Sequence, residues 1–379
     1  MGSRFVFNEV VLQATSLCNL NCSYCYVPNR DKDQRMTPAV TEALVRSLEN
    51  LPKHEHPIWL LWHCGEPMAA GVKHMRALFE PFEELRKKKQ VAHRFQTNAT
   101  LIDKAWCDFL VDYNVEIAVS LDGPPKMNKH RLYWNGKESF DKAIRGIERL
   151  REIGCGDPCV IAVITEDRLG DAQEIYDFFV KIGCSGLGIN IEESHGANLV
   201  RPKVRAERVE KFWRDLYRAN KANPKFEIRE IGLFEDWYAI TKGESPPLEE
   251  QPTYRSNYFP TIGHNGDVVF LSTELIDCDA GKYGTFVVGN ILDESLDDLV
   301  RKMKKTEYVK DFLAGVDACK ATCPYYSFCG GGYATNKFFE LGTMNGTQTS
   351  ACTNVRQRLF DALIKEKRRE EQEALLKAG

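Results

Sequence analysis

The chain has 379 residues, of which 43% are hydrophobic and 28% are charged, and these proportions are typical of an ordinary globular protein. No run approaches the roughly 18 apolar residues that span a bilayer, and no signal segment follows Met1, so we expect a cytoplasmic protein without a membrane partner. The net charge of -3 gives no reason to expect broad electrostatic attraction to nucleic acid, so we expect no nucleic-acid partner.

Short apolar runs alternate with amphipathic helical patterns over residues 5–222. We expect strands at residues 5–14, 58–62, 93–97, 115–121, 159–165 and 187–191. The following helices are expected to begin near Thr37, Val72, Asp103, Ser139, Asp171 and Arg205, with Thr37 and Asp103 as N-caps. Six strand-helix units in a row predict an α/β fold, an incomplete (β/α)6 TIM-like barrel over residues 1–222. Chemistry in such barrels gathers where the strands end.

Cysteines are numerous, and the first group follows the first expected strand. The chain has 13 cysteines and no secretion signal, which argues against a disulfide framework and favours metal ligation. Cys18, Cys22 and Cys25 have the spacing Cys-x3-Cys-x2-Cys. Three thiolates on a 4Fe-4S cluster leave one iron open to an amino-acid ligand. A zinc knuckle is the alternative, although no fourth ligand lies close in the sequence.

Polar segments end the next three expected strands. His63-Cys64-Gly65-Glu66-Pro67 ends the second strand, Asn98 the third, and Ser120 with Asp122 the fourth. Taken alone, Gly-Glu-Pro is also an ordinary turn. Together with the cysteine loop and Tyr24, these segments resemble the radical S-adenosylmethionine (SAM) superfamily, whose GGEP motif meets the ammonium group of the cofactor.

That resemblance implies a set of cofactor contacts, listed here: His63, Cys64, Gly65, Glu66, Asn98, Ser120 and Arg131. Asn98 and Ser120 would bind the ribose or the carboxylate, and Arg131 would pair with the carboxylate. An ordinary surface arginine is the alternative for Arg131. Cys64 stands where the family has its first glycine, which leaves the close backbone approach at that point in doubt.

The composition changes after residue 222. We expect a linking segment over residues 223–260, with a Pro- and Glu-rich stretch at 243–252, and a C-terminal domain over 261–379. That domain begins with a hairpin turn at 265–267 and ends with a charged helix over about 355–377. Between them stand Cys319, Cys323, Cys329 and Cys352, enough thiolates to saturate a second cluster, or a structural zinc ion.

The last third of the chain resembles the SPASM extension of peptide-modifying radical enzymes, and within it the maturases of glycine-rich-repeat peptides, which form three-residue cyclophanes. The segments that carry the resemblance are Gly266, residues 323–332, Asn336-Lys337 and Gly342-Thr343. Leu271 and Tyr333 stand where the full pattern has cysteines, so we expect one auxiliary cluster rather than two. Cys278 remains ambiguous as a ligand. Four other cysteines are expected to be buried thiols: Cys107, Cys155, Cys159 and Cys184.

The function implied is post-translational modification of a ribosomal precursor peptide. SAM would supply a radical that removes a β-hydrogen, the carbon radical would attack an aromatic ring, and the auxiliary cluster would accept the surplus electron. Asp279 and Asp122 are the candidate proton acceptors. The resemblance also implies an external electron donor of the flavodoxin or ferredoxin type.

Two rival functions stay open on the sequence alone. One is a different outcome of the same chemistry, namely oxidation as in sulfatase maturation, thioether formation or epimerisation. The other is a non-enzymatic iron-sulfur or zinc scaffold. Because the first expected strand begins near residue 5, we also expect no separate peptide-binding domain before the barrel.

Overall fold

The computed structural model describes residues 7–51, 56–193, 196–198, 204–245 and 259–378. Its ten strands are β1 (Glu9–Leu12), β2 (Ile58–Trp62), β3 (Val91–Thr97), β4 (Glu116–Ser120), β5 (Cys159–Ile164), β6 (Gly186–Ile191), β7 (Glu227–Ile228), β8 (Thr261–Ile262), β9 (Asp267–Val269) and β10 (Gly289–Asn290). They form one sheet in the order β10-β9-β8-β1-β2-β3-β4-β5-β6-β7.

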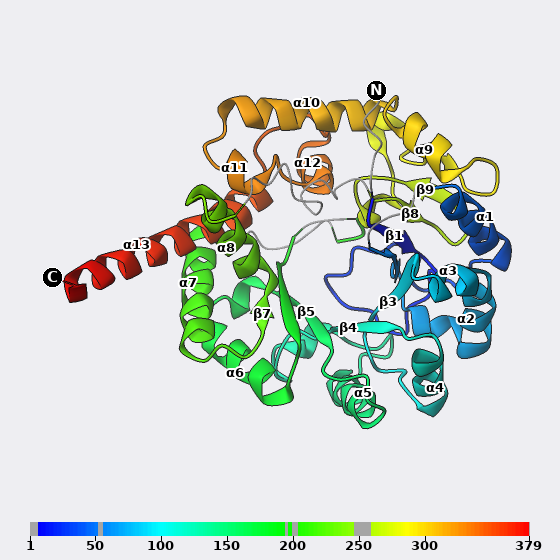
Figure 1. Ribbon diagram of the computed structural model, residues 1–379, viewed down its shortest axis with the longest axis horizontal. Coiled ribbons are helices and arrows are strands. Elements are labelled where there is room, and N and C mark those ends of the chain that lie inside the picture. Colours follow the sequence, from blue (N-terminus) through cyan, green and yellow to red (C-terminus); the bar gives the residue numbers. More distant parts are fainter. Residues whose placement is uncertain (1–6, 52–55, 194–195, 199–203, 246–258, 379) are drawn as a thin grey trace.

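Helices surround this sheet on its outer side and extend beyond it (Figure 1). Those of the first part are α1 (Pro38–Glu49), α2 (Val72–Phe79), α3 (Glu83–Lys87), α4 (Lys104–Asp112), α5 (Phe140–Glu152), α6 (Ala172–Ile182), α7 (Ala206–Ala222) and α8 (Arg229–Thr241). The later ones are α9 (Leu296–Met303), α10 (Glu307–Thr322), α11 (Tyr326–Cys329), α12 (Ala334–Leu341) and α13 (Arg358–Ala378). None of the helices described is long and apolar enough to cross a bilayer.

The six expected strands are all present and pair in parallel as neighbours. The α/β barrel prediction is therefore confirmed, and the helices begin within one residue of the expected positions. Aromatic side chains fill the space between the sheet and its helices. The ring of Phe79 on α2 stacks 4.9 Å from that of Trp62 on β2 and meets Phe109 on α4 at the same distance.

Two short strands extend the barrel at its ends. The segment expected to be a link contains β7, which pairs with β6 in parallel, and α8. A two-residue strand leaves no apolar run to recognise in a sequence, whereas its pairing is plain in the sheet. At the other end β8 pairs in parallel with β1 and then turns back into β9 through the expected hairpin. Most of the Pro- and Glu-rich stretch lies outside the described residues.

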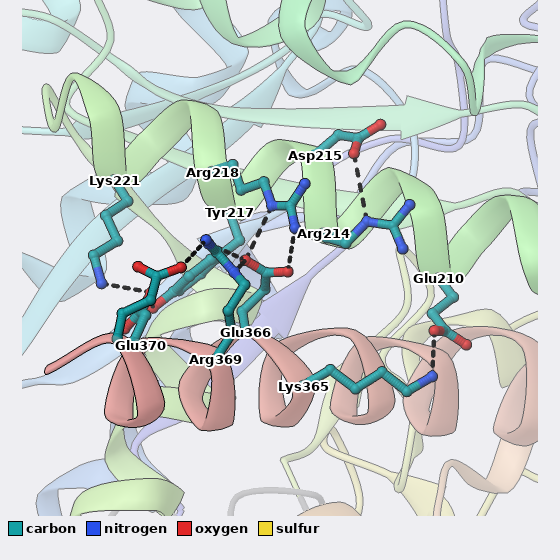
Figure 2. Close-up of polar contacts among 11 residues, drawn as sticks. Glu210, Arg214, Asp215, Tyr217, Arg218, Lys221, Lys365, Glu366, Arg369 and Glu370 are labelled. Atoms are coloured by element: carbon teal, nitrogen blue, oxygen red, sulfur yellow. Dashed lines mark hydrogen bonds and ion pairs between the residues drawn. The ribbon is translucent and has the colours of Figure 1, made fainter. Parts of the chain in front are cut away.

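The C-terminal helix α13 lies along α7 of the barrel, and Figure 2 shows the charged side chains between them. Arg218 and Arg369 both bind the buried carboxylate of Glu366, with shortest distances of 2.8 and 2.7 Å. Burial alone would raise the pKa of Glu366, but hydrogen bonds from the two guanidinium groups outweigh it and hold the pKa below its ordinary value. Lys221 and Glu370 pair at 2.5 Å nearby.

The two predicted N-caps differ in the structure. Oδ1 of Asp103 accepts a hydrogen bond from the Trp106 amide at 2.9 Å, which satisfies one of the free N–H groups at the start of α4. Thr37 is the N-cap residue of α1, as predicted, but its side chain makes no capping hydrogen bond. Pro38 occupies the first turn of α1 as predicted.

We expect Asp103→Ala to destabilise the protein by about 1 kcal/mol, because the Trp106 amide loses its acceptor. Thr37→Ala is the matched control, since it changes an N-cap residue that makes no cap bond, and its effect should stay within about 0.5 kcal/mol. Amide hydrogen exchange at Trp106 and Val40 measures both effects. Equal loss of protection at the two helix starts would contradict the assignment.

Candidate active site

A cavity of about 620 Å³ lies at the carboxyl ends of the barrel strands. All seven cysteines predicted to hold clusters line it: Cys18, Cys22, Cys25, Cys319, Cys323, Cys329 and Cys352. The first three come from the loop after β1, and the other four come from α10, α11 and the turn before α13. The fold therefore brings two distant cysteine groups to one cavity.

The first cysteine loop is held by backbone hydrogen bonds to segments on both sides of it. Cys18 donates to the Arg30 carbonyl at 2.8 Å, where the loop folds back on itself. Ser23 donates to the His130 carbonyl at 3.0 Å, and the Trp134 indole donates to the Cys18 carbonyl at 2.8 Å. The Leu20 amide lies 3.4 Å from the Cys18 sulfur, a contact that stabilises a thiolate.

The segment after β2 packs directly against this loop. Gly65 has φ +140, and a Cβ built there would lie 2.2 Å from the Thr15 carbonyl oxygen, so only glycine fits. The Glu66 amide donates to the Leu17 carbonyl at 2.9 Å. Cys64, at the position of the missing family glycine, adopts a left-handed φ of +64 and is fully buried. The expected close approach of the backbone is thus present at Gly65, whereas the Cys64 side chain does not line the cavity.

Glu66 is a buried carboxylate on the cavity wall that makes no ion pair with a lysine or arginine in the part of the chain described. It accepts hydrogen bonds from the Thr97 hydroxyl at 2.7 Å and from the amides of Asn98 and Met68 at 2.8 and 3.1 Å. Burial raises its pKa, and these bonds only partly oppose the rise. An ammonium group in the cavity would supply the missing positive charge.

Arg131 supplies the opposite charge on the same cavity. Its guanidinium donates to the Tyr24 hydroxyl at 2.8 Å and lies 3.9 Å from the carboxylate of Asp122. The Tyr24 hydroxyl in turn donates to Asp122 at 2.5 Å, and the Val163 amide donates to the same carboxylate at 3.1 Å. Burial raises the pKa of Asp122, and Arg131 opposes the rise. Arg131 is therefore a buried, positioned cation and not the surface arginine that the sequence left open.

The other predicted contact residues of the barrel also line the cavity. The Ser120 hydroxyl accepts from Gln96 at 2.8 Å, and the Asn98 amide donates to Asn19 at 2.8 Å. His63 bonds the Tyr26 hydroxyl through Nε2 at 3.0 Å, while its buried Nδ1 has no partner among the described residues. Burial lowers the pKa of His63 to about 4, so its ring is neutral near pH 7.

The four C-terminal cysteines lie around a glycine-rich turn. Gly330, Gly331 and Gly332 all have positive φ angles, of 70, 101 and 78 degrees. A Cβ on Gly331 would lie 2.9 Å from the side chain of Val316, so this position excludes larger residues. Burial raises the pKa of Cys352 to about 11, and the Gln357 amide approaches its sulfur at 3.6 Å.

Two cations at this second group were not assigned a role from the sequence. Lys337 on α12 is almost fully buried on the cavity wall, and burial lowers its pKa while Cys319, Cys329 and Cys352 oppose the change. Arg356, in the turn before α13, bonds the Tyr333 hydroxyl and lies over its ring. Asn336-Lys337 belongs to the segments that carry the family resemblance, but only the position of Lys337 in the fold shows that its side chain lines the cavity.

Neither carboxylate predicted to accept a proton lines the cavity. Asp279 lies instead in a separate depression of about 410 Å³, together with Cys278 and Phe338. Asp122 is sealed behind Tyr24 and Arg131. Glu274 does line the cavity, beside Thr273, and accepts hydrogen bonds from the Ser272 and Thr273 hydroxyls. Its position on a short turn after β9 gives no sequence signal.

The remaining cysteines lie away from the cavity. Cys107 and Cys184 are buried as expected, but Cys155 and Cys159 are exposed. Cys155 lies in the loop before β5, and Cys159 is the first residue of that strand. No three His, Cys, Asp or Glu side chains among the described residues are close enough to hold a single metal ion. The fit to clusters therefore depends on the shared cavity, the thiolate donors and the N–H groups that approach them.

The donor set fits the two implied groups. Cys18, Cys22 and Cys25 would hold a cluster with one open iron, beside a carboxylate for an ammonium and a guanidinium for a carboxylate. These are the two charged groups of an amino-acid cofactor such as SAM. The four C-terminal thiolates would hold a saturated cluster.

Sequence comparisons agree with this arrangement. The family model of the radical SAM superfamily matches residues 12–165. An uncharacterized protein of Synechocystis sp. is 33% identical over 369 residues, which cover 94% of this chain and 91% of the relative. The cysteine-type anaerobic sulfatase-maturating enzyme of Clostridium perfringens (strain 13 / Type A) is 24% identical over 348 residues, covering 85% and 87%.

Solved structures have the same fold over most of the chain. Native anSMEcpe with bound AdoMet has a TM-score of 0.75 at 20% identity, and the match covers 94% of this chain and 97% of that one. Streptococcus suis SuiB bound to precursor peptide SuiA has a TM-score of 0.65 at 18% identity, and the match covers 91% of this chain and 75% of that one. At these identities the likeness shows a shared barrel with a C-terminal domain.

We expect Gly65→Ala to prevent assembly of the first cluster, because the new Cβ would displace the Thr15 carbonyl at the start of the cysteine loop. Gly71→Ala is the matched control: Gly71 also has a positive φ, of +83, but a Cβ there meets nothing within 4 Å. Iron content and absorbance after reconstitution report the result. Equal iron loss in both variants would show that backbone strain, and not the contact with Thr15, matters at Gly65.

Proposed function

The chain belongs to the radical SAM superfamily, and from this premise we propose that it modifies a ribosomal precursor peptide by joining an aromatic ring to a side-chain β-carbon. Membership makes the chain an enzyme that uses SAM and a 4Fe-4S cluster. The observation that carries the proposal is the single cavity lined by both cysteine groups. A substrate residue in that cavity would lie beside both redox sites.

The proposed crosslink removes two hydrogens from the peptide. When bound, SAM supplies hydrogen-atom abstraction at the β-carbon, and the auxiliary cluster supplies a one-electron sink. The ring must then release one proton to become aromatic again. We assign its uptake to Glu274, because this carboxylate lines the cavity and neither Asp279 nor Asp122 does. External reduction by a flavodoxin- or ferredoxin-type donor would prime the first cluster.

The substrate class is supported by the relatives and the cavity. The C. perfringens relative is named for sulfatase maturation, and SuiB was solved with a precursor peptide. A cavity of about 620 Å³ is of the size that encloses a small ligand or a few side chains. Leu271 and Tyr333 line its wall at the positions where the resemblance would place additional cysteines, which favours one auxiliary cluster.

Sulfatase-type oxidation is the second candidate, favoured by the 24% identity that extends over 85% of the chain. It uses the same abstraction of hydrogen, but no ring is joined. Thioether formation and epimerisation differ again in their products. The mass and connectivity of the product distinguish all four outcomes.

We expect the triple variant Cys18→Ala, Cys22→Ala, Cys25→Ala to lose SAM cleavage and keep the C-terminal cluster. Iron should fall from about eight to about four per chain, because each cluster holds four irons. A matched control replaces Cys107, Cys155 and Cys184, which do not line the cavity, and should retain about eight. Deoxyadenosine release measures SAM cleavage, and iron analysis measures cluster content. SAM cleavage by the Cys18, Cys22 and Cys25 variant would refute the assignment of the first cluster.

We expect a peptide encoded beside this gene, coexpressed with the enzyme, to become lighter by about 2 Da for each ring formed, since crosslinking removes two hydrogens. Tandem mass spectrometry and NMR should locate a bond from an aromatic carbon to a β-carbon. A crosslink through sulfur, a carbonyl product or an unchanged mass would exclude cyclophane formation while leaving the radical enzyme intact.

Glu274→Gln supplies an internal control for that experiment. The variant should still release deoxyadenosine but form much less crosslinked peptide, because only the proton acceptor is lost. Asp279→Asn, which alters the depression outside the cavity, should leave product formation near the unaltered level. The reverse pattern would place the proton acceptor at Asp279.

A further inference from the structure

Lys337 is a buried cation without a carboxylate partner in the described structure. Its side chain is only 2% exposed, and Nζ has neither a hydrogen-bond acceptor nor an ion pair among the residues described. The nearest ring, Phe312 on α10, has its centroid 5.3 Å from Nζ. Burying an ammonium group is costly unless a negative charge lies nearby.

The negative charge available to Lys337 comes from the C-terminal thiolates. Lys337 lines the same cavity as Cys319, Cys329 and Cys352, and negative charge on these thiolates favours the charged form of the lysine. The lysine stem lies close to the glycine-rich turn, since a Cβ built on Gly332 would be 4.0 Å from the Lys337 Cε, an ordinary van der Waals distance. The lysine stem thus passes beside the turn that follows Cys329.

We propose that Lys337 is the counter-charge of the auxiliary cluster and raises its reduction potential, so that this cluster accepts the electron released when the peptide ring becomes aromatic. This inference rests on the proposed function for the presence of the cluster. One-electron reduction adds a negative charge to a cluster that four thiolates already make negative. A fixed ammonium in a site away from water stabilises that reduced state strongly, because the low local dielectric screens it little.

The first cysteine group has a different electrostatic environment. There the cavity wall carries the buried carboxylate of Glu66, with Arg131 as the cation. The barrel side therefore offers one charge of each sign, whereas the buried Lys337 on the C-terminal side is a cation without a carboxylate partner among the described residues. A net positive charge beside the C-terminal cluster favours its reduced form.

The test is a potentiometric titration of the reconstituted full-length protein, followed by electron paramagnetic resonance without any peptide. SAM binds only the first cluster, so the signal that SAM does not change belongs to the auxiliary cluster. Lys337→Met removes the charge, and Lys337→Arg keeps it. Lys320→Met is the matched control, because Lys320 follows Cys319 directly but is exposed to water, where its charge is screened.

At the midpoint potential of the unaltered protein, we expect the ratio of reduced to oxidised auxiliary cluster to be about tenfold lower in Lys337→Met. This change equals a fall of about 59 mV in the reduction potential of a one-electron couple. Lys337→Arg and Lys320→Met should stay near the unaltered ratio. An unchanged ratio in Lys337→Met, or an equal fall in Lys320→Met, would overturn the inference.

Assembly gives a second readout if the neutral variant loses iron. Loss of the auxiliary cluster in Lys337→Met with retention in Lys337→Arg would also support a counter-charge, whereas loss in both would assign the side chain a packing role and overturn the inference. Absence of any auxiliary signal in the unaltered protein would instead refute the cluster. A peptide product other than a cyclophane would change the proposed function alone, since the titration contains no peptide.

Discussion

The common cavity depends on the contact between α13 and α7. The first cysteine loop belongs to the barrel, whereas Cys352 lies just before α13, so the place of Cys352 on the cavity wall depends on how that helix is held. Glu366, buried between two arginines, and the aromatic contact of Phe360 with Trp237 at 4.9 Å fix it in place. Arg369 lies on α13 itself, so the pair of Glu366 with Arg218 is the one that joins α13 to α7.

Within the cavity, charge is distributed to match what each site must hold. An amino-acid cofactor carries both an ammonium and a carboxylate, and the barrel side offers Glu66 for one and Arg131 for the other. A cluster bound by four thiolates carries only negative charge, and the C-terminal side offers Lys337 and Arg356. The same principle of local neutrality explains both sets of buried ions.

Positive backbone φ angles occur at two of the three positions where this chain departs from the family pattern, while the third, Tyr333, has a φ of -101 degrees. Cys64 and Leu271 both adopt φ values near those that favour glycine, of 64 and 77 degrees. The Cys64 carbonyl accepts a hydrogen bond from the Gln13 side chain at 2.8 Å, which helps to hold the conformation. Neighbouring contacts thus help to hold a backbone conformation at Cys64 that non-glycine residues rarely adopt.

The sequence by itself determined the order of strands and helices and the two cysteine groups with their spacings, because apolar periodicity and ligand spacing are local properties of the chain. It could also place Glu66 at a strand end, since parallel strands bring those ends together, whereas Arg131 was assigned from the family resemblance. Only the tertiary structure decided that both cysteine groups share one cavity, that Asp279 and Asp122 do not line it, and that Lys337 and Glu274 do. These facts depend on how segments far apart in the chain pack, and a lone lysine or glutamate leaves no periodic signal of that packing.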